Sequence, residues 1–191
     1  MLKNPCVIFI GSSGAGKSTV MQKCLNESWP NGWKTQQFKK LTTRIQRDPL
    51  DELEGEYKTN EEIQEMQAAG LLGVLCEKFD NFYAITRESM KHDYRTVYMQ
   101  CLSASVVRKL KSADEYSVHA CLLEVRSETA RARILSRKRH ITASELDERV
   151  LNGQGLHLRT AADVIIPADG EMEVVFADVR TWLTSLLAKH E

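Results

Sequence analysis

The 191-residue sequence has no excess of charge of either sign, because 26 lysines and arginines oppose 26 aspartates and glutamates. A balanced chain is not attracted as a whole to nucleic acid or to an anionic membrane, so any anion must be bound by locally placed cations. The sequence also lacks an apolar run of about 18 residues, and the apolar run that follows Pro5 is too short for a signal sequence. These absences predict a cytoplasmic protein with no nucleic-acid or membrane partner.

Cysteine pairs are missing as well. The cysteines are odd in number and widely spaced, and none belongs to a C-x-x-C motif; they are Cys6, Cys24, Cys76, Cys101 and Cys121. This pattern favours reduced thiols, most of them in the core, over a disulfide framework. The five histidines show no metal-ligand spacing either, and surface or core roles are expected for them.

The length and the apolar content of 42 % suit one α/β domain with a sizeable core. Strands are expected at 6–10, 33–41, 96–99, 118–124 and 163–166. Helices are expected from Lys17, from a capping box at 59–62, from Ser127, from a second capping box at 142–145, and at the C-terminus. The segment 48–58 reads as an exposed excursion. Strands alternating with helices predict a three-layer α/β core with a mostly parallel sheet.

The most informative stretch is Gly-Ser-Ser-Gly-Ala-Gly-Lys-Ser at 11–18, hereafter the phosphate loop, which fits the P-loop pattern G-x-x-x-x-G-K-[ST]. Its glycines let successive N–H groups converge on phosphate oxygens, and the following helix adds the positive end of its dipole. We expect Lys17 to reach the β- and γ-phosphates of a nucleotide and Ser18 to ligate Mg²⁺. The expected phosphate-binding residues are Gly11, Ser13, Gly14, Ala15, Gly16, Lys17, Ser18 and Thr19.

Two further motifs indicate which kind of P-loop protein this is. There is no N-K-x-D motif and no acidic residue at the end of a clear apolar strand, but Thr-Thr-Arg-Ile-Gln-Arg lies at 42–47 and Asn-Phe-Tyr-Ala-Ile-Thr at 81–86. With the phosphate loop, these motifs make the chain resemble the guanylate kinase family. The resemblance implies a P-loop NTPase fold in a single domain over 1–191. Its parts would be a core (1–35, 89–127 and 151–191), an acceptor-binding subdomain (about 36–88) and a lid (about 128–150).

The resemblance also assigns roles to residues of this sequence. Two arginines and a tyrosine would clamp the acceptor's phosphate with a second tyrosine nearby, namely Arg44, Arg47, Tyr83 and Tyr57. Guanidinium groups suit this task because they bind phosphate through two parallel hydrogen bonds. The lid would bring arginines to the transferring phosphoryl group, so that the implied catalytic residues are Lys17, Arg137, Arg139 and Arg149. The implied donor is ATP with Mg²⁺, the implied partner is a small phosphorylated acceptor, and the chain would be a monomer or homodimer.

The sequence departs from the family where the acceptor's base is read. Val74 and Ile85 occupy the positions of a Glu and a Ser that contact guanine, Ala84 replaces a glycine, and Gln100 stands where an Asp is expected. Because apolar side chains form no hydrogen bond with a base edge, strong specificity for GMP is not expected. The acceptor remains open between a nucleoside monophosphate and a ribosyl phosphate, as in the related ribose 1,5-bisphosphate phosphokinases. Two further alternatives are a non-catalytic module that binds phosphoproteins and a nucleotide switch.

Overall fold

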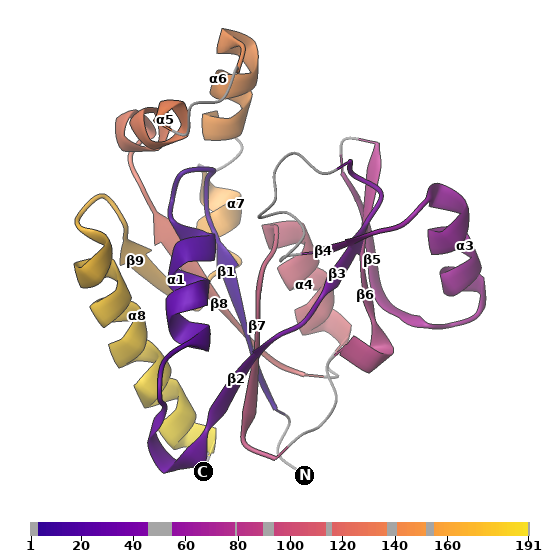
Figure 1. Ribbon diagram of the computed structural model, residues 1–191, viewed down its shortest axis with the longest axis horizontal. Helices are drawn as coiled ribbons and strands as arrows, with labels where there is room; N and C mark the ends of the chain where they lie inside the picture. Colours follow the sequence, from indigo (N-terminus) through magenta and orange to yellow (C-terminus); the bar gives the residue numbers. More distant parts are fainter. Residues whose placement is uncertain are drawn as a thin grey trace.

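A five-stranded sheet forms the centre of the computed structural model, which describes residues 4–45, 55–78, 80–89, 94–113, 116–136, 141–151 and 155–190. All its pairings are parallel, and the spatial order is β2-β7-β1-β8-β9. The strands are β1 (Pro5–Ile10), β2 (Lys34–Gln37), β7 (Thr96–Cys101), β8 (Ser117–Glu124) and β9 (Val164–Pro167). Helices α1 (Lys17–Leu25) and α8 (Met172–Leu187) cover one face, and α4 (Ala104–Ala113) and α7 (Leu156–Arg159) the other (Figure 1). The predicted three-layer α/β fold is confirmed.

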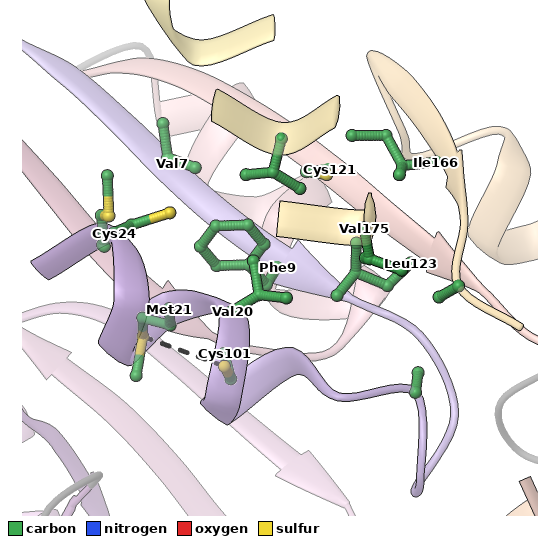
Figure 2. Close-up of a cluster of buried hydrophobic side chains, with 14 of the residues drawn as sticks. Val7, Phe9, Val20, Met21, Cys24, Cys101, Cys121, Leu123, Ile166 and Val175 are labelled. Atoms are coloured by element: carbon green, nitrogen blue, oxygen red, sulfur yellow. Dashed lines mark hydrogen bonds between the residues drawn. The ribbon is translucent and has the colours of Figure 1, made fainter. Parts of the chain in front are cut away.

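Strand β1 is buried on both faces, which explains its unbroken apolar run. Val7 and Phe9 point toward α1 and α8, where they pack with Met21 and other apolar side chains (Figure 2). Ile8 and Ile10 alternate with them and pack on the opposite side of the sheet. Such a central parallel strand places the phosphate loop at the carboxyl edge of the sheet, where α/β proteins bind their ligands.

A second, four-stranded sheet lies beside the first, with the spatial order β4-β3-β6-β5. It contains β3 (Lys40–Thr42), β4 (Gly55–Tyr57), β5 (Leu72–Lys78) and β6 (Asn81–Thr86), and helix α3 (Asn60–Ala68) packs on one of its faces. The predicted capping box of α3 is confirmed, since Thr59 and Glu62 exchange hydrogen bonds at 3.2 and 2.7 Å. The expected excursion over 48–58 is corrected in part, because residues 55–57 form strand β4, while residues 48–54 lie outside the described residues. A three-residue strand is too short for an alternating pattern that the sequence could reveal.

Helix α4 joins the two sheets. Its Val107 and Leu110 belong to one continuous apolar cluster that also contains Val74 and Ile85 of the second sheet. The ammonium of Lys109 donates to the carbonyl of Leu75 at 2.7 Å, so a polar contact reinforces the apolar one. The second sheet is therefore packed on the core and is not merely tethered to it.

The remaining helices are α5 (Ser127–Leu135) and α6 (Ala143–Leu151), which stand together at the upper end of the molecule in Figure 1. Arg131 of α5 forms an ion pair with Asp147 of α6, and the N–H of Glu145 donates to the Thr142 hydroxyl at 3.2 Å, as the second predicted cap requires. Short 3₁₀ turns lie at Pro30–Gly32, Arg87–Ser89 and Ala188–His190. All five cysteines are free and buried, as predicted. Among the described residues, no helix has the length and apolar character needed to span a bilayer.

Candidate active site

The phosphate loop has a positive φ, which strongly favours glycine, at three positions. Gly11, Gly14 and Gly16 have φ angles of +141°, +82° and +84°. A Cβ atom on Gly11 would lie 2.5 Å from the carbonyl oxygen of Leu123, and one on Gly14 would lie 2.8 Å from that of Ala130. The loop can therefore press against the end of β8 and the first turns of α5 only because these side chains are absent.

Lys17 folds back over this loop. Its ammonium donates to the carbonyls of Gly11 at 3.0 Å and Ser12 at 2.7 Å, which holds the charge beside the glycine-rich backbone. Helix α1 begins directly behind it, with Gly16 as a left-handed N-cap, no side-chain cap and no acidic residue in the first turn. The positive end of the helix dipole and the lysine thus act at one place, as an anion site requires.

The residues around the loop fit a magnesium–nucleotide better than a metal held by protein alone. Gln100, at the position where the family has an Asp, is fully buried; it donates to the Phe38 carbonyl and accepts from the Cys101 N–H. No group of three histidine, cysteine or carboxylate side chains among the described residues could hold a metal ion. A hydroxyl at Ser18 plus phosphate oxygens and water suits Mg²⁺, which usually keeps several waters.

A cavity of about 320 Å³, hereafter the β8–β9 pocket, opens at the carboxyl ends of β8 and β9. It is lined by Leu122, Glu124, Val125, Arg126, Gly155, Leu158, Pro167 and Asp169. Its volume lies within the range of roughly 300–1,000 Å³ typical of small-molecule sites, and its mixture of apolar walls and a few charged groups is also typical. The pocket is therefore a candidate site for a small molecule.

Fixed ion pairs hold the charged groups of this pocket. The backbone N–H of Arg126 donates to the Asp169 carboxylate at 3.0 Å, and its guanidinium lies 3.4 Å away. Burial raises the pKa of Asp169, but hydrogen bonds from Arg126 and Thr129 outweigh it, so that this pKa lies below its ordinary value. Glu124 accepts two hydrogen bonds from Arg159, at 2.8 and 2.6 Å. Hydrogen bonds therefore hold both carboxylates in place, and the lowered pKa keeps Asp169 ionised at neutral pH.

The second sheet brings three of the predicted acceptor residues together. Thr42 of β3 is paired with Tyr57 of β4 on one side and with Tyr83 of β6 on the other. Arg44 follows two residues later, and its N–H donates to the Thr42 hydroxyl at 3.1 Å. Arg44, Tyr57 and Tyr83 thus lie around one end of this sheet, while Arg47 lies outside the described residues. In Figure 1 this end of β3 and the phosphate loop are both on the upper side of the molecule.

The predicted lid arginines are only partly described. Arg137 and Arg139 lie outside the described residues, and Arg149 lies on α6. The guanidinium of Arg149 donates to Glu145, one turn earlier on the same helix, and four-fifths of its side chain is covered. Arg149 thus makes a salt bridge within its own helix, and its catalytic role stays a prediction.

The two positions that depart from the guanine-reading pattern are neighbours across the second sheet. Val74 and Ile85 are directly paired, and they are 6 % and 2 % exposed. Between them and Leu110 and Tyr116 there remains a gap of only about 10 Å³, no more than a single water would fill. Apolar packing against α4 therefore occupies the space beside these side chains.

Arg133 of α5 contributes a set of contacts that the sequence did not predict. Its guanidinium donates to four backbone carbonyls, one in the phosphate loop and three in the loop after β9. The sequence motifs assign no role to Arg133. Because its partners are carbonyls, which every residue possesses, no sequence pattern identifies them.

Comparison with known proteins supports the architecture. No family model matches the sequence, and no curated protein matches it either. Among solved structures, a guanylate kinase from Anaplasma phagocytophilum superposes with a TM-score of 0.64 and 15 % sequence identity. The match covers 98 % of this chain and 85 % of that one. The fold is thus that of a P-loop protein, and more narrowly it is guanylate-kinase-like.

Proposed function

We propose that the protein is a kinase that transfers the γ-phosphoryl group of ATP to the phosphate group of a small acceptor. The observation that carries this proposal is the phosphate loop, whose three positive-φ glycines and folded-back Lys17 form a candidate anion site in a guanylate-kinase-like fold. The cluster of Arg44, Tyr57 and Tyr83 supplies a second candidate anion site. Two anion sites suit a reaction between two phosphorylated molecules.

In the proposed reaction, the phosphate loop and Lys17 bind the β- and γ-phosphates, and Ser18 helps to hold Mg²⁺, which neutralises phosphate charge when bound. The β8–β9 pocket is the proposed place of the donor's base. An oxygen of the acceptor's phosphate attacks the γ-phosphorus, and the bond from that phosphorus to the β-phosphate oxygen breaks, which releases ADP. Since a phosphate acceptor is already an anion, positioning and cationic screening suffice, and no general base is required.

The acceptor in this proposal is a nucleoside monophosphate or a ribosyl phosphate, without strong preference for GMP. The burial of Val74 and Ile85 against α4 supports this choice, because neither side chain offers a hydrogen bond to a base. The same observation favours ribose 1,5-bisphosphate as a second candidate acceptor, in a reaction that would form 5-phosphoribosyl diphosphate. A non-catalytic phosphoprotein-binding module is less well supported, because such a module has no need of a complete phosphate loop.

The proposal is tested by measuring ATP consumption with Mg²⁺ over GMP, dGMP, AMP, CMP, UMP, dTMP and ribose 1,5-bisphosphate. We expect turnover with at least one acceptor and no strong preference for GMP. A kcat/KM for GMP about a hundredfold above every other acceptor would show that guanine is read elsewhere in the site.

Lys17→Ala is the matching variant, and Lys23→Ala is its control. Both lysines lie on α1, and Lys23 pairs with the exposed Glu173 of α8. Lys17→Ala should stay folded and lose turnover by about a hundredfold or more, whereas Lys23→Ala should stay within about twofold of the unaltered protein. Unchanged kcat in Lys17→Ala would refute the kinase. Absence of a thermal shift at millimolar ATP would favour the binding module.

A further inference from the structure

Two separate parts of the proposed nucleotide site meet at one guanidinium group. Nη1 of Arg133 lies 2.7 Å from the Ala168 carbonyl and 3.4 Å from that of Gly14, while Nη2 lies 3.1 Å from the Gly170 carbonyl and 3.3 Å from that of Asp169. Gly14 belongs to the phosphate loop, and residues 168–170, hereafter the carbonyl loop, continue from the wall of the β8–β9 pocket. Arg133 therefore bridges the phosphate loop and that wall.

Arg133 also fixes the orientation of one peptide unit in the phosphate loop. In a peptide unit the C=O and the N–H point in opposite directions, so a carbonyl held outward turns the next N–H inward. The Gly14 carbonyl faces Arg133, and the N–H of Ala15 points back into the loop, toward the Ser12 carbonyl at 3.3 Å. A planar guanidinium with several donors in a fixed fork can fix several carbonyls at once.

Backbone packing locks α5 in the same place. The Cα of Gly14 lies so close to the Ala130 backbone that an added Cβ would come within 2.8 Å of its carbonyl oxygen, and Ala130 is fully buried. On the other side, the N–H of Ala168 donates to the Glu124 carbonyl at 2.7 Å, which ties the carbonyl loop to the end of β8. Arg133 thus lies between two anchored segments and adds a direct link between them.

We propose that Arg133 is a positioning residue of the nucleotide site, which ties the phosphate loop to the carbonyl loop and so sets the phosphate-binding and base-binding parts at a fixed separation. The inference rests on the proposed function for its consequence, because only a ligand that spans both parts senses the separation. ATP spans both. Inorganic tripolyphosphate reaches only the phosphate loop, so it should depend less on Arg133.

The experiment compares Arg133→Met and Arg133→Lys with Arg131→Met. Arg131 lies two residues earlier on α5, pairs with Asp147 and is partly exposed, so its variant removes the same charge from the same helix without touching either loop. Hydrogen exchange of the ligand-free proteins reports the loops directly. Amides at 11–17 and 168–172 should exchange about tenfold faster or more in both Arg133 variants, and at the unaltered rate in Arg131→Met.

Calorimetry with magnesium then separates positioning from charge. Both Arg133 variants should bind ATP about tenfold more weakly and tripolyphosphate only about two- to threefold more weakly, with kcat at saturating ATP changed less than about twofold. If Arg133 acts only through its charge, Arg133→Lys will restore both affinities, and the proposal fails. Unchanged exchange in both loops would also overturn it. If Arg133→Met does not fold, Arg133→Lys carries the test. If the unaltered protein binds no ATP, the proposed function fails, while hydrogen exchange still reports on the role of Arg133.

Discussion

Gly14→Ala tests the close approach of the phosphate loop to α5. Gly14 has φ +82°, and the added Cβ would lie 2.8 Å from the Ala130 carbonyl oxygen, a backbone atom that moves only with its helix. The left-handed conformation costs a residue with a Cβ about 1–2 kcal/mol, and overpacking against a buried backbone costs about 1–3 kcal/mol more. We therefore expect Gly14→Ala to lower the free energy of unfolding by about 2–5 kcal/mol.

Gly70→Ala is the control, because it carries the conformational cost without the packing cost. Gly70 has φ +69°, close to that of Gly14, but no atom within 4 Å of the position its Cβ would take. Both substitutions restrict the unfolded chain equally, so the difference between them measures the contact alone. In urea-induced unfolding followed by tryptophan fluorescence, Gly14→Ala should lose about 1–3 kcal/mol more than Gly70→Ala. Equal losses within about 0.5 kcal/mol would refute the packing of the loop on α5.

Three further predictions follow from burial and capping. Burial raises the pKa of Cys24 to about 12, and the other four cysteines are buried too. A thiol reagent at pH 8 should therefore modify the native protein very slowly, and it should modify all five thiols after denaturation. Rapid labelling of the native protein would contradict the placement of the cysteines in the core. Burial and the neighbouring imidazole hold the pKa of His119 below 6.5, and burial lowers that of His190. As the pH falls, the imidazoles of the unfolded chain take up protons before those of the folded protein, so the free energy of unfolding should fall as the pH drops from 7 through 6.5 to 5.5. The double variant His119→Gln, His190→Gln should flatten this slope in urea titrations. An equal slope would contradict the assignment of the pH dependence to these two histidines. Thr59→Ala should lower Tm by about 2–4 °C in calorimetry, because it removes the N-cap of α3, and no change would mean that this helix is held by packing alone.

Local signals in the sequence predicted the elements that depend on local chemistry. The apolar run of β1, the glycines of the phosphate loop and the Thr59 capping box each specify their structure within a few residues, and the structure contains all three. The alternation of strands with helices along the chain likewise predicted the mostly parallel central sheet.

The features that the sequence did not predict depend on distant contacts. Helix α4 has an apolar face at 104, 106, 107 and 110, but nothing in that spacing says that it packs on two sheets at once. Strand β4 is held by its pairing with β3 and is too short for a pattern of its own. Arg133 binds backbone carbonyls that carry no residue identity. A pattern within one segment of sequence therefore predicts neither long-range packing nor contacts to backbone carbonyls.

Phosphorus NMR of the products tests the central claim most directly, namely that a phosphate on one small molecule accepts the phosphoryl group of another. The unaltered protein is incubated with ATP, Mg²⁺ and the most active acceptor of the panel, and the signals of the acceptor are followed over time. The account predicts that ADP and a new acceptor diphosphate form in equal amounts, with little inorganic phosphate. ADP formed together with an equal amount of inorganic phosphate, and no new diphosphate, would contradict it.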